Sequence, residues 1–215
     1  DYLDAGITDA SILKDAGFTA SELRGVGYTL NALITAQYTV AQLKQAEYTA
    51  AELKSAGYSL FEILSVGYTA PNLKNAGFTA TEMKQYFTIA GMKGAGFTAL
   101  ELRNALYTLS ALVNVGYTAV QLTTAGYTAA QLKPYFALSV LVDAGFNASQ
   151  LKTAVFTATE LRLYFTLSEL VSAGFNAGDL KTATFSATEL KPHFTIVEKK
   201  SAGFTKSLVV EAYLN

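Results

Sequence analysis

Hydrophobic and polar residues recur along this chain with a period of ten. The segments "AGFTASELRG" from Ala16 and "AEYTAAELKS" from Ala46 show the pattern, in which an aromatic residue, a hydroxyl residue and a leucine keep fixed positions. About 21 such units follow one another without a linker between them, and self-similarity at a short fixed period is the signature of a tandem repeat. The sequence therefore predicts a single repeat domain over residues 1–215.

Each unit carries start and stop signals for a short α-helix. Thr19 is followed three residues later by Glu22, which is the spacing of a capping box. Phe18 before the cap and Leu23 after it have the spacing of a hydrophobic staple. Lys or Arg near the helix end suits the helix dipole, and the Gly that follows favours the left-handed residue that ends a helix. We expect about seven helical residues, or two turns, in each unit.

Helices this short need neighbours, because isolated helices of fewer than about 12 residues are marginal in water. If the aromatic residue, the leucine and the small first residue of each unit face inward, successive units stack and bury a continuous core. The sequence thus predicts an all-α solenoid of about 21 two-turn helices in decapeptide repeats. The phrase as a whole resembles uncharacterised decapeptide tandem-repeat proteins of the AGFTAxELK type, a resemblance that implies no activity.

A right-handed β-helix is the alternative fold. "AGFTA" and "SELRG" from Ala16 resemble the five-residue unit of pentapeptide repeat proteins, and that resemblance implies a β-helix. Two features disagree with it: several units lose one residue, which would shift the register of a β-ladder, and large or rigid side chains occupy a position that the family keeps small. These side chains are Phe61, Pro71, Leu100 and Val120. The capping boxes favour the helical fold.

A longer period of 29 residues lies within the shorter one. In about every third unit the fifth and ninth positions, usually Ala and Lys, become large and apolar, although two units change only the fifth position, at Ile89 and Ile196. The units of nine residues belong to this class and lose the Gly stop, which predicts a tighter corner, as at Pro134 and Tyr135. About three helices per coil would explain this period.

Three further features concern the regularity of the coil. The class members that begin at residues 86 and 105 are only two units apart, so we expect a phase slip or kink near residues 86–105. Residues 205–215 predict a longer capping helix at the C-terminal end. Lys199 stands where other units place Leu, which predicts a weakened last coil.

The paired apolar positions define a candidate interface stripe, because residues four apart share one face of a helix. The stripe consists of Leu30, Ile34, Leu60, Leu64, Leu109, Val113, Leu138, Val142, Leu167 and Val171. One interpretation places these side chains in the core, beneath a shorter corner. The other leaves them on the surface, where contiguous apolar area usually marks a protein interface.

Charge and composition narrow the classes of partner. The chain has 16 basic and 17 acidic residues and a net charge of −1, so it lacks the basic field that nucleic acid or an anionic membrane surface would attract. The sequence predicts no membrane span, because no apolar run reaches about 18 residues. The chain has no cysteine, which excludes disulfides and thiolate ligands and leaves the compartment open.

Residues for catalysis are scarce. His193 is the single histidine, and it replaces the Tyr of the other nine-residue units, so we expect it to pack at a corner. The carboxylates recur mostly at capping positions and form no evident acid–base pair. Asn147 begins the glycosylation sequence Asn-Ala-Ser, yet it also occupies an N-cap position, which explains it. We therefore expect no enzymatic activity, no cofactor, no metal site and no small-molecule substrate.

The predicted function follows from the repeat and from the stripe. We expect a non-catalytic structural or scaffolding protein that self-associates or packs with another protein into a larger assembly or filament. The alternative is a protein- or peptide-binding module that uses the candidate interface stripe to hold one partner.

Overall fold

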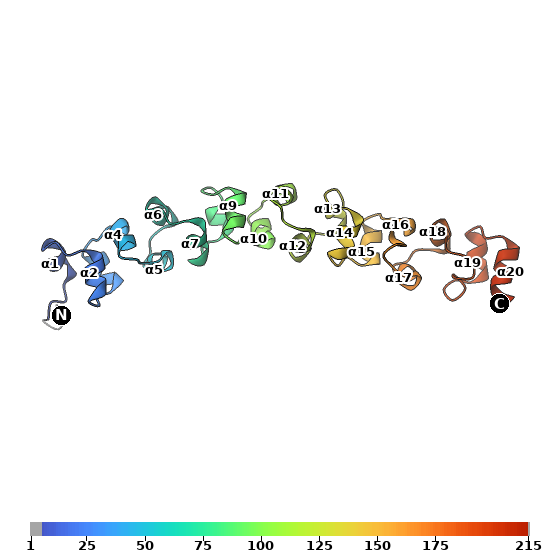
Figure 1. Ribbon diagram of the computed structural model, residues 1–215, viewed down its shortest axis with the longest axis horizontal. Coiled ribbons are helices and arrows are strands. Elements are labelled where there is room, and N and C mark those ends of the chain that lie inside the picture. The colour runs from blue at the N-terminus through green and yellow to red at the C-terminus, as the bar shows by residue number, and fades with distance from the viewer. Residues whose placement is uncertain (1–5, 215) are drawn as a thin grey trace. The chain divides into compact units, whose positions relative to one another are not determined.

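The structure is a computed structural model that describes residues 6–214. Within this range it contains 20 short helices and no β-strand (Figure 1). The all-α fold predicted from the capping boxes is confirmed, and the β-helix is wrong. The physical reason is that the backbone N–H groups outside the helices bond to carbonyls three to five residues earlier, not across a ladder.

The chain divides into two compact units, which meet in the sequence between Val115 and Gly116. The first unit contains α1 (Ala10–Asp15), α2 (Ala20–Gly25), α3 (Leu30–Thr35), α4 (Val40–Gln45), α5 (Ala50–Ser55), α6 (Leu60–Ser65), α7 (Ala70–Asn75), α8 (Ala80–Met83), α9 (Ile89–Gly94), α10 (Ala99–Asn104) and α11 (Leu109–Asn114). The second unit contains α12 (Ala119–Thr124), α13 (Ala129–Leu132), α14 (Leu138–Asp143), α15 (Ala148–Thr153), α16 (Ala158–Leu161), α17 (Leu167–Ser172), α18 (Ala177–Thr182), α19 (Ile196–Ser201) and α20 (Lys206–Leu214).

The capping signals act as the sequence predicts. At the start of α2 the backbone N–H of Glu22 donates to Thr19 Oγ1 at 3.2 Å, and the backbone N–H of Thr19 donates to Glu22 Oε2 at 2.7 Å. At its end Gly27 has a φ of 98° and Tyr28 N–H donates to Leu23 O at 3.0 Å, the bond of a Schellman motif. Both ends of a six-residue helix are thus satisfied locally.

Tight corners replace the glycine stop before the nine-residue units. After α13, the N–H groups of Tyr135 and Phe136 both donate to Leu132 O, at 2.9 and 3.1 Å. The helices before such corners are only four residues long, as in α8, α13 and α16. The repeat at residues 183–192 forms turns instead of a helix. Lys191 N–H donates to Thr188 O, three residues earlier, whereas Arg162 N–H at the end of α16 donates to Ala158 O, four residues earlier. One of the 21 expected helices is therefore missing from the described chain.

Helices pack most closely on their second neighbour along the chain. In the first unit α2 packs on α4 and α5 on α7, and in the second unit α13 packs on α15 and α16 on α18 (Figure 1). Polar contacts span the same interval, since Tyr38 Oη donates to Phe18 O at 2.6 Å. The packing repeat is two units, so the expectation of three helices per coil is wrong. In the second unit the 29-residue period is the interval between the tight corners at residues 133–136, 162–165 and 191–194.

The core consists of one large apolar side chain per repeat, with small residues and aromatic rings around it. The residue at the eighth position of a unit is buried throughout the described chain, and at Leu33, Ile63 and Met92 it is fully inaccessible. Lys199 takes this place in α19 and is also fully buried. The core therefore runs as a continuous column through each unit.

The remaining expectations concern regularity. Bridges from Lys74 to Gly96 and from Lys84 to Ala105 keep the two-repeat interval across residues 86–105, and the kink expected there stays a prediction. The longer terminal helix is present as α20, while Asn215 lies outside the described residues. None of the helices in the described chain has the length and apolar composition that a membrane crossing requires.

Candidate functional site

The candidate interface stripe is neither core nor fully open surface. All ten of its side chains are half-buried. Each stripe residue is either the first or the second-to-last residue of its helix. Helices that carry the stripe also pack on their second neighbours, α14 on α12 and α17 on α15. The structure therefore places the stripe residues at the boundary between core and solvent, and the interface stays a prediction.

Exposed apolar residues at the tight corners adjoin the stripe in the sequence. Leu163 is 84% exposed and Tyr164 is 42% exposed, four and three residues before the stripe residue Leu167. Ile196, at the position equivalent to Leu167 one 29-residue period later, is 52% exposed. Sequence reasoning did not select Leu163, although its signal was visible: it is an apolar residue at a position where other units place Gly, Ser, Thr, Asn, Gln, Asp or Pro.

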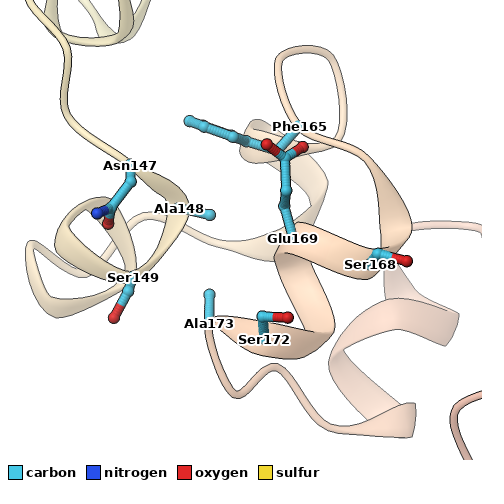
Figure 2. A pocket seen from close by; sticks show the side chains of 8 residues that line it. All are labelled: Asn147, Ala148, Ser149, Phe165, Ser168, Glu169, Ser172 and Ala173. Carbon is cyan, nitrogen blue, oxygen red and sulfur yellow. The ribbon is translucent and has the colours of Figure 1, made fainter.

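The cavities are shallow grooves, and they repeat. One groove has a volume of about 330 Å³ and lies between the start of α15 and the helix α17 two repeats later (Figure 2). It is lined by Asn147, Ala148, Ser149, Phe165, Ser168, Glu169, Ser172 and Ala173. A second groove of about 330 Å³ is lined by the eight residues that follow these at an interval of 29, from Asn176 to Ala202. The grooves are therefore products of the repeat.

Basic residues at the ninth position join three repeats. Lys133 Nζ donates to Val155 O at 2.8 Å and to Ala154 O at 3.1 Å, at the corner two repeats later, and lies 4.1 Å from the centre of the Phe156 ring. Charge-assisted bonds of this kind exceed neutral ones in strength. The residues that bridge to a corner in this way are Lys14, Arg24, Lys44, Lys54, Lys74, Lys84, Lys93, Lys133, Lys152, Arg162 and Lys181.

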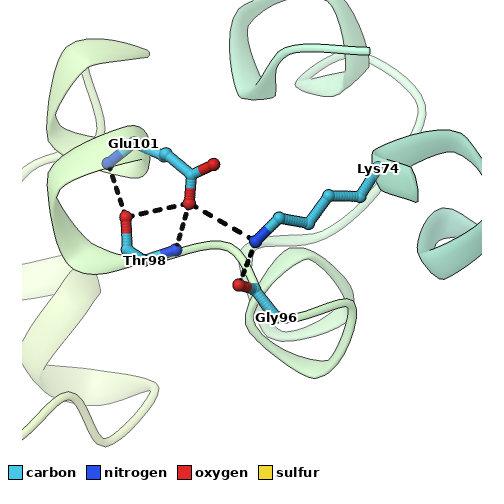
Figure 3. Close-up of polar contacts among 4 residues, drawn as sticks. All are labelled: Lys74, Gly96, Thr98 and Glu101. Atoms are coloured by element: carbon cyan, nitrogen blue, oxygen red, sulfur yellow. Dashed lines mark hydrogen bonds and ion pairs between the residues drawn. The ribbon is translucent and has the colours of Figure 1, made fainter. Parts of the chain in front are cut away.

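One bridge also reaches a capping carboxylate (Figure 3). Lys74 Nζ donates to Gly96 O and to Glu101 Oε2, the latter at 3.4 Å, and Glu101 in turn accepts from the backbone of Thr98 at 2.6 Å. Burial raises the pKa of Glu101, but the bonds from Thr98 and the charge of Lys74 outweigh it, so its pKa lies below the ordinary value. Such a carboxylate is unsuited to act as a general acid near neutral pH.

The bridges also hold corners that lack glycine. Left-handed residues other than glycine are strained, and those in the described chain are Gln37, Glu47, Leu106, Val155 and Thr184. Each of them lies at a corner that receives a Lys or Arg side chain from two repeats earlier. The basic residues of the ninth position are thus structural. Sequence reasoning assigned them to the helix dipole and missed the bridges, which their constant interval from the corner could have indicated.

A family model described as a decapeptide repeat region matches residues 6–80, 67–136 and 135–206. The chain belongs to the decapeptide repeat family. The resemblance to decapeptide tandem-repeat proteins is confirmed. No curated protein and no solved structure gives a significant match to the chain.

Most ionisable groups of the decapeptide repeats lie at helix ends. The described residues contain no group of three His, Asp or Glu side chains that could hold a metal ion. In the capping boxes, backbone and side-chain bonds from Thr or Ser lower the pKa of the glutamates, as Thr19 does for Glu22. Asn147 accepts from Gln150 N–H at 2.9 Å, so its role as an N-cap is confirmed. His193 is exposed at its corner, which differs from the packed position that we expected.

Proposed function

We propose that this decapeptide repeat chain is a non-catalytic scaffolding protein that assembles with further copies of itself through the candidate interface stripe. The observation that carries the proposal is the half-buried state of all ten stripe side chains. A core residue would be inaccessible, as Leu141 and Leu170 are on the same helices. Apolar area left at the surface is stabilised when a partner covers it.

The absence of charge along the stripe supports association. At the ninth position most ordinary repeats have a Lys or Arg, whereas Val142 and Val171 leave this position apolar. Leu163 and Tyr164 add exposed apolar area at the corner between α16 and α17. A second copy of the chain repeats the same features at the same 29-residue interval, so its corners and helices match the spacing of the first.

A non-catalytic role agrees with the use of the ionisable side chains. The capping glutamates accept bonds from the backbone of their own helix, and the basic residues donate to the carbonyls of a distant corner. Acid–base catalysis needs such groups aimed at a reacting atom. The grooves between repeats are shallow and recur with the period of the sequence, so no single cavity is distinguished as an active site.

The test is a variant in which four stripe residues of the second unit become lysine. These residues are Leu138, Val142, Leu167 and Val171. We expect light scattering to show loss of assembly while circular dichroism shows the same helix content as the unaltered chain. A matched control places lysine at four exposed positions on the same or neighbouring repeats, Ser139, Thr159, Ser168 and Thr188, and should assemble normally.

A second variant covers the case in which the first does not fold. Leu163→Lys with Ile196→Lys changes only side chains that are more than half exposed, so it should fold and should assemble less. Loss of helix content in the four-lysine variant together with normal assembly of Leu163→Lys, Ile196→Lys would place the stripe in the core and contradict the proposal.

A peptide-binding module is the second candidate, and the repeated grooves favour it. Two grooves of about 330 Å³ recur at an interval of 29 residues in the second unit, a spacing that an extended partner could follow. A chain that remains a monomer at all concentrations, with its stripe intact, would favour this function over assembly.

A further inference from the structure

The corners of the coil are of two kinds. The residue at the ninth position two repeats earlier differs between the two kinds. Where a corner contains a left-handed residue, that earlier residue is usually Lys or Arg, and its side chain donates to the corner carbonyls. Where the corner is tight, the earlier residue is apolar, as Leu64 is before the corner at residues 84–87 and Val142 before that at residues 162–165. At a tight corner one carbonyl accepts from two N–H groups of the corner, as Leu161 O does from Tyr164 and Phe165.

Two corners that contain a left-handed residue are not preceded, two repeats earlier, by Lys or Arg. Ile34 precedes the corner at Gly57, and Thr123 precedes the corner at Gly145. Ile34 is apolar, and a Cβ built on Gly57 meets no atom within 4 Å. Thr123 is short and polar, and its hydroxyl donates back to Ala119 O at 2.8 Å in its own helix. The corner at Gly145 therefore receives no basic side chain from the described residues.

Space is open at this corner where the other corners hold an ammonium. A Cβ built on Gly174 would lie 3.2 Å from Lys152 Nζ, and one built on Gly67 would lie 3.3 Å from Lys44 Nζ. A Cβ built on Gly145 meets no atom within 4 Å. The position of the bridging ammonium is thus accessible to solvent at Gly145.

The groups that hold an ammonium elsewhere are present here. The carbonyls of Ala144 and Gly145 correspond to those of Ala154 and Val155, to which Lys133 donates. Phe146 corresponds to Phe156, whose ring lies under the Lys133 ammonium. No side-chain donor within the described chain reaches the Ala144 or Gly145 carbonyl.

A groove leads to this corner. It has a volume of about 420 Å³, and Thr123 and Phe146 line it together with Gln150 and Thr153. The equivalent groove in the first unit, between α5 and α7, has Lys44 in the place of Thr123. The remainder of the lining is uncharged, so no side chain repels a cation that enters.

We propose that the corner at Ala144, Gly145 and Phe146 binds a primary alkylammonium group supplied by a ligand, such as the side chain of a lysine in a partner protein. The ammonium donates to the two carbonyls, its charge lies beside the Phe146 ring, and its alkyl stem lies in the groove past Thr123. The shape of the site follows from the nine lysines that already fill equivalent corners. The proposal is independent of assembly through the stripe.

The test uses n-butylammonium, which reproduces a lysine side chain from Cβ to Nζ. Titration into the ¹⁵N-labelled chain should shift the amide resonances of Gly145 and Phe146 in a saturable way, while those of Gly174, which Lys152 already covers, stay fixed. Acetyl-lysine-N-methylamide, titrated in parallel, separates the sources: shifts with both probes indicate a lysine side chain, and shifts with butylammonium alone indicate a small free amine. The uncharged 1-butanol should have no saturable effect.

Two variants make the result decisive. Thr123→Lys should fill the corner from within, raise the melting temperature and abolish the shifts at Gly145. Lys152→Thr should open the corner at Gly174 and give it a second set of saturable shifts. Absence of saturable shifts at Gly145, or shifts that survive in Thr123→Lys, would overturn the proposal.

Discussion

The ammonium of Lys74 lies 3.4 Å from the carboxylate of Glu101, which caps a helix three repeats further along the chain. The same ammonium donates to Gly96 O at the corner between them (Figure 3). A single side chain thus links α7, the end of α9 and the start of α10. Because each repeat is too short to be stable alone, such links distribute stability along the solenoid.

Removal of this link should destabilise the first unit. Lys74→Met keeps the length and hydrocarbon of the side chain but loses the bonds to Gly96 and Glu101. We expect the free energy of unfolding to fall by about 1 to 2 kcal/mol, less than for a buried charge pair because Lys74 is 24% exposed. Urea denaturation followed by circular dichroism measures the change.

The matched control is Lys200→Met. Lys200 occupies the equivalent position in α19 and is exposed, and its side chain has no hydrogen-bond partner among the described residues. It should change the free energy of unfolding by less than about 0.5 kcal/mol. Equal effects of the two substitutions would contradict the role assigned to the bridges.

The corners without glycine predict a stabilising substitution. Val155 has a φ of 60° and is 78% exposed, so its side chain contributes backbone strain and little packing. Val155→Gly should raise the free energy of unfolding by about 1 kcal/mol. The reverse change, Gly145→Ala at a φ of 92° where a Cβ meets no neighbour, should lower it by a similar amount. Thermal denaturation of both variants checks the sign.

Acid should destabilise the array. Nine capping glutamates accept bonds from the N-cap backbone and side chain, and their pKa values lie below the ordinary value of 4.5; they are Glu22, Glu52, Glu62, Glu82, Glu101, Glu160, Glu169, Glu189 and Glu198. A group whose pKa is lower in the folded state contributes stability above its unfolded pKa and loses it as the pH falls through the folded value. The melting temperature should therefore be flat above about pH 5 and fall below it.

Glutamine variants isolate the cause of the acid effect. The chain itself uses Gln42 and Gln121 in complete capping boxes, so Glu22→Gln, Glu52→Gln and Glu62→Gln should fold. They should flatten the fall in melting temperature between about pH 5 and pH 3. An unchanged acid profile would show that other groups control it.

Replacement of the buried lysine of the last coil should increase stability locally. Lys199 is fully inaccessible in a position where other repeats place Leu, Ile, Met or Val. Replacement of a buried polar contact by a well-packed apolar residue is often stabilising, by about 1 kcal/mol or more. Lys199→Leu should raise the protection of α19 and α20 in hydrogen exchange and leave α1 to α9 unchanged. Reduced protection would indicate that the lysine stabilises the coil.

Local structure could be predicted from the sequence because its causes lie within ten residues. Thr19 and Glu22 bond each other, and Gly27 ends α2, so the letters of one repeat are sufficient to place one helix. The tighter corner at Pro134 and Tyr135 followed in the same way from the loss of one residue. The turns at residues 183–192 could not be predicted, because this repeat has the same capping pattern as α16, which does form a helix.

The packing interval could not be predicted because it depends on which repeats touch. The 29-residue period indicated three helices per coil, whereas the helices pack on their second neighbours. Val142 is apolar because the corner it faces is tight, and Lys133 is basic because its corner exposes the carbonyls of Ala154 and Val155. The stripe residues were recognised by this exchange, but their half-buried state appears only in the folded chain.

The most direct test of the proposed scaffolding role is the molar mass of the chain in solution, measured by light scattering over a range of concentrations. We predict a mass greater than that of one chain, which rises with concentration and returns to that of one chain when Leu138, Val142, Leu167 and Val171 are replaced by lysine. A mass equal to that of a single chain at every concentration would contradict self-assembly through the stripe.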